Sequence, residues 1–278
     1  MESNYPETFY KYRPATDYTV YLLKKHEIKF AYAEEYNDPF DSKVIIKAES
    51  DIDGVLRTLE TTPIDEKVKR DLRKRIKKGE ISIEELRTAA YETAKRTIMS
   101  SCFSTKSDNL LLWSHYAESH KGICVGIRNC SSTQIPGMKF NIGDDDLNPG
   151  PISSEVYKSG VFPVHKVNYS DSGIVEWEVY KNDIQIFMDA HTTKAKCWEY
   201  EDEYRLLLAR SAFCSRILDF DPRFLVEIYF GCCIETEFQT KVQQVLKECY
   251  LNKGIDVKVF QMVSSKKNFA LEKIEIGI

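Results

Sequence analysis

Three glutamates at two-residue spacing stand out in the run 198–208, which reads WEYEDEYRLLL. Its apolar second half predicts a strand that enters the core, and strand side chains alternate between faces. If the strand extends back through the run, Glu199, Glu201, Glu203 and Arg205 share one face. Neighbouring carboxylates repel one another, so a protein keeps them where a cation or polyhydroxyl ligand uses the charge or where water screens it. One hypothesis is therefore a site with one glutamate as base or electrostatic stabiliser and its neighbour orienting the substrate. The alternative is a solvated strand end with one Glu–Arg pair.

Composition limits the class of protein. The chain has 278 residues, 42% of them hydrophobic and 29% charged, which is typical of a globular protein with a sizeable core. The net charge of -4 argues against broad, sequence-independent binding of nucleic acid. No signal peptide is recognisable at the start, and no apolar run reaches the roughly 20 residues of a membrane span. We therefore expect a cytoplasmic protein without a membrane partner.

Cysteine usage fits the same expectation. The eight cysteines are scattered, and the five histidines do not stand near them at the spacing of metal ligands. We expect reduced thiols and no metal site.

Hydrophobic periodicity predicts an α+β fold with a mixed, mainly antiparallel, split sheet and flanking helices. The expected strands cover 9–13, 28–32, 44–46, 98–105, 123–127, 164–169, 203–208, 217–218, 225–230, 257–263 and 270–276. The expected helices cover 17–25, 82–99, 110–120, 174–192 and 237–253. Asp17 and Asp108 are the expected caps of the first and third helices, and Ser82 with Glu85 forms a capping box.

We expect a single domain with two insertions. One is a helical block at about 51–99, whose basic run 67–78 predicts either a solvated helix face or a contact with phosphates. The other is a loop at about 131–163, because 135–163 is rich in Gly, Pro, Asn, Asp and Ser.

Two further motifs have structural explanations as well as functional ones. The run 37–41, NDPFD, predicts a turn in which Asp38 and Asp41 cap the backbone. Trp113 and Tyr116 lie three residues apart on the expected helix 110–120, where an aromatic stripe most often packs in the core.

Taken together, these motifs resemble a bacterial family that is catalogued only as a domain of unknown function. The resemblance extends over almost the whole chain. It rests on YKY at 10–12, NDPFD at 37–41, CFS at 102–104, LWSHYA at 112–117, KGICVGI at 121–127 and WEYEDEYR at 198–205.

The order of the motifs is also distantly similar to that of ADP-ribosyltransferases, which bind NAD in a split antiparallel sheet. That similarity implies Arg13 or Tyr12 as the residue on the first strand, and Ser104 with Thr105 as the middle element. It also implies Trp113 and Tyr116 as further contacts to NAD, which would be the substrate. Glu203 would stabilise the oxocarbenium ion and Glu201 would orient the nucleophile of a macromolecular acceptor. Families of this kind often act as toxins or defence effectors.

Two other functions stay open. A metal-dependent nuclease would hold Mg²⁺ between Asp38 or Asp41 and the pair Glu201 and Glu203. Such sites usually carry a lysine close behind the acidic pair; here Arg205 stands at that offset and cannot serve as a base. A non-enzymatic ligand-binding or interaction protein would use the Trp, Tyr and Glu residues as the walls of a pocket.

Overall fold

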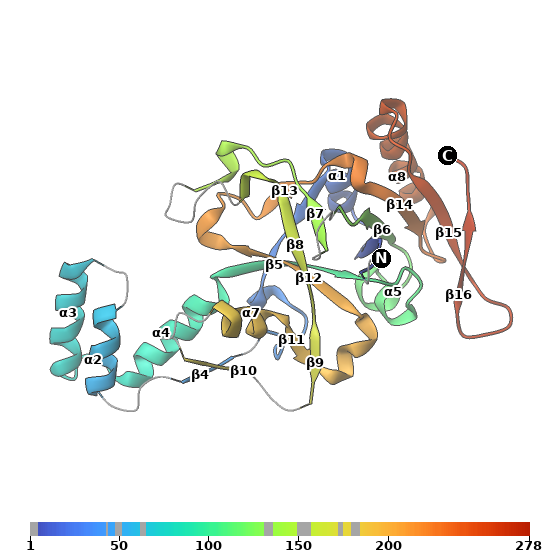
Figure 1. Ribbon diagram of the computed structural model, residues 1–278. Helices are drawn as coiled ribbons and strands as arrows, with labels where there is room; N and C mark the ends of the chain where they lie inside the picture. Colours follow the sequence, from blue (N-terminus) through green and yellow to red (C-terminus); the bar gives the residue numbers. More distant parts are fainter. Residues whose placement is uncertain are drawn as a thin grey trace. The chain divides into compact units, whose positions relative to one another are not determined.

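A computed structural model provides the coordinates, and it describes residues 5–42, 44–47, 52–61, 65–130, 136–148, 157–171, 175–178 and 184–278 (Figure 1). Within these ranges no helix combines the length and the apolar character that crossing a membrane would need. The chain forms two compact units. Unit 1 comprises 1–31, 99–167 and 197–278, and unit 2 comprises 32–98 and 168–196. The single-domain organisation stays a prediction.

Unit 1 is built on a large sheet (Figure 1). The strands follow one another across it in the order β16 (Leu271–Glu275), β15 (Lys258–Ser264), β14 (Leu225–Phe230), β6 (Ile123–Arg128), β1 (Thr8–Arg13), β5 (Ile98–Ser104), β12 (Glu203–Ala209), β8 (Val161–Lys166) and β7 (Gly137–Lys139). Strands β14 and β15 run parallel, whereas β1–β6, β6–β14, β15–β16 and β8–β12 are antiparallel pairs. The predicted mixed, mainly antiparallel sheet of an α+β protein is therefore confirmed.

The two faces of this sheet have different chemistry, which the alternation along β1 defines. Tyr10 is paired with Ser104 and Tyr12 with Cys124, so all four side chains lie on one face, here called the aromatic face. Lys11 and the other odd-numbered residues of β1, Phe9 and Arg13, lie on the opposite face, here called the cationic face. Functional groups on β1 are thus divided between two separate surfaces.

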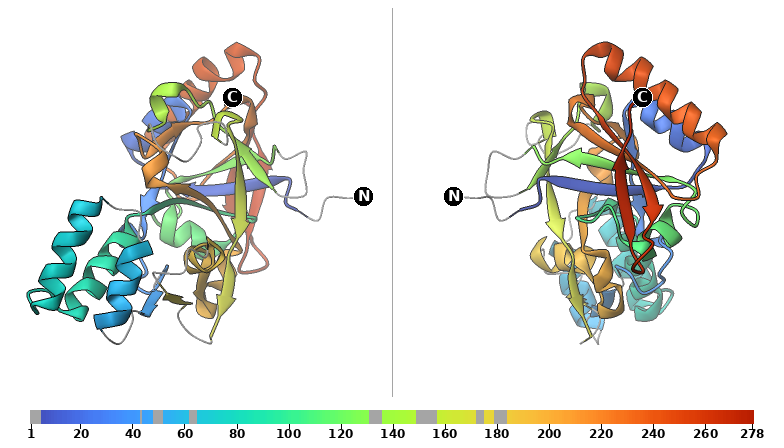
Figure 2. Two further views of the ribbon diagram at one scale, coloured as in Figure 1. Left: turned by 60° about the vertical axis from the view of Figure 1, so that its left-hand side comes forward. Right: turned by 90° about the vertical axis from the view of Figure 1, so that its right-hand side faces the viewer.

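Helix α1 (Asp17–Lys25) packs on the cationic face, and α8 (Thr236–Cys249) lies beside it (Figure 2). The hydroxyl of Tyr250 donates a 2.8 Å hydrogen bond to the carbonyl of Leu23, which fixes the end of α8 to α1. The N-cap of α1 is Thr16, whose hydroxyl accepts from the amide of Thr19. The prediction of Asp17 as cap was wrong by one residue.

Helix α5 (Leu110–Tyr116) covers the aromatic face, and its Trp113 is fully buried with the ring edge-on to Tyr12 at 5.3 Å. Its N-cap is Asn109, whose side chain accepts from the amides of residues 111 and 112, so the prediction of Asp108 was wrong. The helix also ends four residues earlier than predicted. Three residues with positive φ, 118–120, turn the chain so that the amide of Gly122 reaches the carbonyl of Ala117.

Gly122 explains why the chain re-enters the sheet so closely at this point. A Cβ on Gly122 would lie 2.0 Å from the carbonyl oxygen of Arg13. Only glycine therefore allows β6 to begin beside the end of β1.

Two predicted segments differ from the structure. The loop predicted at 135–163 contains β7, a short 3₁₀ turn η2 (Asp144–Asp146) and the start of β8, while 131–135 and 149–156 lie outside the described residues. The helix predicted at 174–192 is a strand, β10 (Val175–Glu178), followed by α7 (Ile184–Thr192), with 174 and 179–183 outside the described residues. Strand β10 pairs with β4 (Val44–Lys47), and pairing with a distant strand is not visible in local periodicity.

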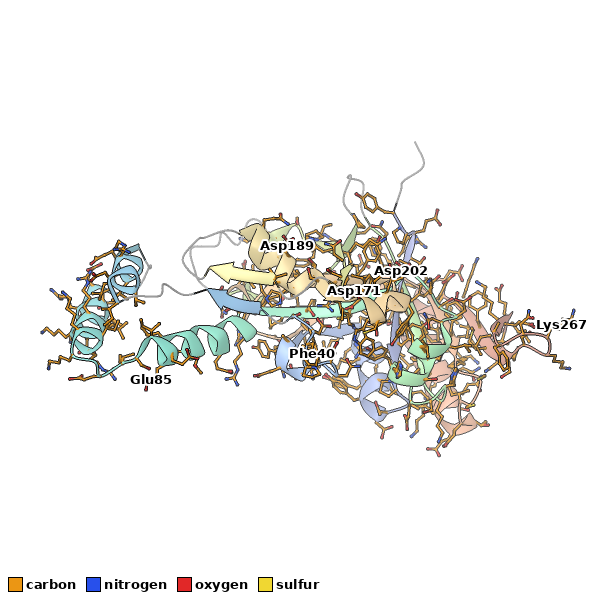
Figure 3. The ribbon with its side chains drawn as sticks, turned by 90° about the horizontal axis from the view of Figure 1, so that it is seen from below. Phe40, Glu85, Asp171, Asp189, Asp202 and Lys267 are labelled. Carbon is orange, nitrogen blue, oxygen red and sulfur yellow. The ribbon has the colours of Figure 1, made fainter. Side chains whose placement is uncertain are left out.

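Unit 2 contains three successive helices, α2 (Ile52–Thr61), α3 (Glu66–Lys77) and α4 (Ile83–Lys95). The predicted capping box at α4 is confirmed, because the Ser82 amide donates to Glu85 at 2.7 Å and the Glu85 amide to Ser82 at 3.1 Å (Figure 3). In α3 the basic run is mostly exposed, as the solvated-face prediction requires, but Lys69 is buried and donates to the carbonyl of Glu60. Most of the predicted strands and helices are present within a few residues of their predicted ends.

The remaining elements are short. In unit 1, β2 (Glu27–Lys29) pairs with β13 (Ile217–Asp219), and 3₁₀ turns lie at η3 (Lys196–Glu201), η4 (Arg210–Ala212), η5 (Pro222–Phe224) and η6 (Leu251–Lys253). In unit 2, β9 (Asn168–Ser170) pairs with β11 (Thr193–Ala195), and η1 (Ala33–Glu35) is a single turn. A short segment, β3 (Ala31–Tyr32), follows β2.

Candidate functional site

The Glu-x-Glu motif lies where a 3₁₀ turn is followed by a strand, and Figure 3 labels its middle residue, Asp202. The 3₁₀ turn η3 ends at Glu201, and β12 begins at Glu203. Between them Asp202 has φ 44°, in the left-handed region that Asp and Asn adopt more readily than other residues with a Cβ. The prediction of a strand through 199–205 was therefore wrong: Glu199 is exposed on the turn, whereas Glu201 and Glu203 are buried.

Glu203 forms a buried ion pair with Arg205, two residues further along β12. The guanidinium donates from Nε at 2.7 Å and from a terminal nitrogen at 3.0 Å, one bond to each carboxylate oxygen. Arg205 is 0% exposed and Glu203 only 4% exposed. Burial and the adjacent Glu203 raise the pKa of the Cys102 thiol, on the neighbouring β5, to about 12. The carboxylate is thus held in one orientation in a site from which water is largely excluded.

Glu201 is held from two other elements of unit 1. The Tyr116 hydroxyl, at the end of α5, donates to Glu201 Oε1 at 2.8 Å. The Ser104 hydroxyl, at the end of β5, donates to the Glu201 carbonyl at 2.6 Å, and the Thr105 hydroxyl donates to the carboxylate of Asp202. The structure therefore brings together Ser104, Thr105, Tyr116, Glu201 and Glu203, all of which the sequence singled out.

A cluster of aromatic rings surrounds this carboxylate. The ring of His115 lies 6.2 Å from Tyr116, 6.4 Å from Trp198 and 6.5 Å from Tyr200, measured between ring centroids. The two rings of η3, Trp198 and Tyr200, lie 5.9 Å apart. His115 is exposed and the other three are partly exposed, so the rings present π surface to solvent next to a buried carboxylate. Such a surface is suited to stacking against a planar aromatic group.

Tyr12 and Trp113 are also on the aromatic face, but their polar atoms bond within the protein. The Tyr12 hydroxyl donates to the carbonyl of Lys106 at 2.7 Å, and Trp113 Nε1 donates to the carbonyl of Ser107 at 2.8 Å. Both bonds fix the segment between β5 and α5. These two residues therefore position the site and do not offer a free hydrogen-bonding group to a ligand.

Arg13 lies apart from these residues. It is on the cationic face with Lys11 and α1, whereas Glu201 and Glu203 contact residues of the aromatic face. Of the two first-strand candidates, only Tyr12 shares a face with Ser104 and the glutamates. The physical reason is the two-residue period of the strand, which sends adjacent side chains to opposite sides of the sheet.

A further carboxylate lies on the aromatic face and was not predicted from the sequence. Glu227 on β14 accepts hydrogen bonds from the hydroxyls of Tyr10 at 2.9 Å and Tyr229 at 3.0 Å. Burial, followed by the neighbouring Tyr229 and Glu227, raises the pKa of Tyr10, and burial raises the pKa of Tyr229 to about 12. The available signal was a lone acidic residue within an otherwise apolar strand, opposite Gly126, whose missing side chain leaves the space that Glu227 occupies.

The NDPFD motif has a structural role within unit 2. Asp38 accepts from the amide of Phe40 at 2.8 Å, as the turn prediction requires. Asp41 pairs with Lys194 at 3.4 Å, and both side chains are 4% exposed. In the part of the chain that the structure describes, no three His, Cys, Asp or Glu side chains are grouped to bind a metal ion. The magnesium nuclease stays a prediction without support from this geometry.

Comparison with known proteins identifies no relative. No protein-family model matches the chain, and no curated protein and no solved structure is significantly similar to it. The resemblances drawn from the motifs therefore remain predictions, and any function has to be argued from the site itself.

Proposed function

We propose that this protein is an ADP-ribosyltransferase-like enzyme that uses NAD as substrate and modifies a macromolecule. The observation that carries the proposal is the hydrogen bond between Tyr116 and Glu201, beside a partly exposed aromatic cluster. It combines a buried, oriented carboxylate with π surface suited to a nicotinamide or adenine ring. The position of β1, β5 and β12 as successive strands of the sheet also supports it, because the three motif elements of such a site then lie side by side.

The chemistry assigned to the site is a glycosyl transfer. The bond between the nicotinamide nitrogen and ribose C1′ breaks, and nicotinamide leaves with the electron pair. Positive charge develops at C1′, and an adjacent carboxylate lowers the energy of that state. A lone pair of the acceptor then forms the new bond to C1′, and the acceptor's proton passes to a carboxylate acting as base. Glu201 is assigned the base and acceptor-orienting role, and Glu203 the stabilising one.

The test is release of nicotinamide from NAD by the wild type, Glu201→Gln and Glu203→Gln, in the presence of protein, RNA or DNA acceptors. Glu199→Gln is the matched control, because Glu199 is exposed on the same turn. We expect turnover by the wild type and the control, and a loss of about 100-fold or more in the two other variants. Equal rates in all four proteins would remove both glutamates from the mechanism. The role as toxin or defence effector belongs to the same proposal and requires that an acceptor be found.

A second candidate is a protein that binds an NAD-like ligand without turnover. The Glu203–Arg205 pair favours it, because Arg205 neutralises the charge that would otherwise stabilise a cation. The same assay separates the two candidates. A binding protein would melt at higher temperature with NAD and release no nicotinamide.

A further inference from the structure

The cationic face of unit 1 contains a recess that the proposed reaction does not use. The recess is shallow: it encloses about 20 Å³, and about 330 Å³ when the open space at its mouth is included. Lys11 and Arg13 of β1 stand on its floor, and α1 and β2 contribute Thr19, Leu22 and Glu27 to its walls. Because it lies across the sheet from Glu201, it is a separate site.

Arg13 is the unusual residue in this recess. Its side chain is only partly exposed, yet its guanidinium has no hydrogen bond and no ion pair with any residue that the structure describes. Burial lowers the pKa of Arg13 to about 10, so the group stays charged at neutral pH. A guanidinium offers five donors in a planar arrangement that matches two oxygens of one carboxylate or phosphate. Because these donors bond to no side chain of the described residues and the group is partly exposed, an anion from solvent can reach them.

Lys11 provides a second cation on the same face. Its Nζ donates to the Ser101 hydroxyl and to the Cys102 carbonyl, both at 2.8 Å, and stands 4.7 Å from the centre of the Phe103 ring. An ammonium has three donors, so one remains for a ligand. Residues two apart on a strand are separated by roughly 7 Å, a span that one bound oxyanion can bridge from both ends. Below about pH 7, where Lys11 is charged as well as Arg13, the two side chains therefore define a site for one anionic group.

The remaining walls describe the rest of the ligand. Glu27 is the acidic residue of the recess, and its buried Oε2 has no hydrogen-bond partner within the described ranges. Burial, and then the nearby Asp219, raise the pKa of Glu27. The other walls are apolar and come from Leu22, Leu23, Ile28, Val125, Ile127 and Phe220. They offer apolar contact to a hydrocarbon chain that lies at the open mouth of the recess.

The geometry points to a ligand site in which Arg13 and Lys11 bind the oxyanion of a small acid, and apolar side chains of α1 and β2 contact its body. A carboxylate and a phosphate monoester share the required chemistry. The site is independent of the proposed transferase activity and of Glu201.

The test is calorimetric titration of the protein with acetate, butanoate and hexanoate in one arm, and with phosphate and butyl phosphate in the other, at constant ionic strength. The wild type, Arg13→Gln, Arg13→Lys and Lys11→Met are compared. Arg128→Gln is the matched control, because Arg128 is exposed at the end of the adjacent β6. We expect saturable binding in at least one arm, tighter for the longer alkyl chain.

Arg13→Gln and Lys11→Met should each weaken binding by about tenfold or more, the value of one or two hydrogen bonds between charged groups. Arg13→Lys should bind the anion more tightly than Arg13→Gln but less tightly than the wild type. Arg128→Gln should bind it as tightly as the wild type. If a variant fails to fold, the Arg13 Nε–H resonance of the wild type still reports the site, because it should shift with ligand. No binding in either arm, or equal binding by wild type and Arg13→Gln, would overturn the proposal.

Discussion

The hydroxyl of Tyr116 lies 2.8 Å from Oε1 of Glu201, and the two residues come from elements that are 85 positions apart in the chain. Neither residue is placed by its own segment alone. Tyr116 is the last residue of α5, and Glu201 is the last residue of η3, so each is fixed by the end of a different element. The contact therefore depends on the fold of unit 1 as a whole, and it is the most direct target for mutation.

Tyr116→Phe should reduce NAD turnover while leaving the fold intact. A hydrogen bond to a charged group is worth about 1.5–3 kcal/mol, so its loss should lower kcat by about 10-fold to 100-fold if it acts in the transition state. Tyr21→Phe is the matched control, because Tyr21 is 47% exposed on α1. Nicotinamide release and thermal melting measure the two effects separately. Unchanged kcat in Tyr116→Phe would mean that this contact serves stability alone.

Arg205→Met should destabilise the protein strongly. It leaves Glu203 as an unpaired, buried carboxylate, and breaking a buried pair in this way costs about 3–5 kcal/mol. The chain contains its own control in Arg223, which holds Asp221 with the same two-residue spacing but is 76% exposed. Arg223→Met should destabilise the protein far less, because water screens this exposed guanidinium. Urea unfolding of both variants measures the difference.

A double variant separates the cost of an unpaired charge from the value of the pair. Replacing both partners, Glu203→Gln with Arg205→Met, should recover much of the lost stability, because no charge then stays buried. A double variant as unstable as Arg205→Met alone would contradict this explanation.

The two faces of β1 show how far the sequence could predict the site. The two-residue period of a strand separates Tyr10 and Tyr12 from Lys11 and Arg13, yet it cannot decide which face carries the function. That depends on where α5 and α1 pack, which is a tertiary property. The Glu-x-Glu motif was found from its composition, but its backbone was predicted as a strand, because a left-handed Asp202 between two acidic residues leaves no periodic signal.

The contact between Glu227 and Tyr10 could not be predicted from the sequence for a different reason. Glu227 lies 217 residues from Tyr10, and only the pairing of β14 with β6 and of β6 with β1 brings them together. Hydrophobic periodicity describes single elements and carries no information about strand order, so this contact required coordinates.

Gly126→Ala should disturb the hydrogen bonds of Tyr10 and Tyr229 to Glu227, although none of these three residues is replaced. A Cβ on Gly126 would lie 2.9 Å from the Cβ of Glu227 and 3.2 Å from its Oε2. Strand β14 or the Glu227 side chain has to move, and overpacking of this kind costs about 1–3 kcal/mol. Gly277→Ala is the control, because no atom lies within 4 Å of the added methyl group. Chemical denaturation measures the cost, and equal stability of both variants would show that β14 adapts freely.

Lys11 should make stability depend on pH above neutrality. Burial, and then the charge of Arg13, lower the pKa of Lys11 to about 7, against about 10.4 for an unfolded lysine. Between these two values the unfolded chain binds more protons than the folded protein, so the free energy of unfolding rises with pH across this window. Below about pH 7 Lys11 is protonated in both the folded and the unfolded state. The free energy of unfolding is then lowered by the full cost of burying the charged ammonium.

Lys11→Met should abolish this rise in the free energy of unfolding. Urea unfolding of both proteins between about pH 6.5 and about pH 9.5 measures it, because this range covers most of the window between the two pKa values. The other groups near the ammonium are Arg13, Cys102 and Glu203, and the Cys102 thiol, with its pKa of about 12, stays neutral throughout. Glu27 also lines the recess, so Glu27→Gln provides the control for its charge. If the free energy of unfolding changes with pH in the same way in the wild type and in Lys11→Met, the prediction is wrong and the Lys11 ammonium is solvated. Lys11 would then be charged at every pH tested.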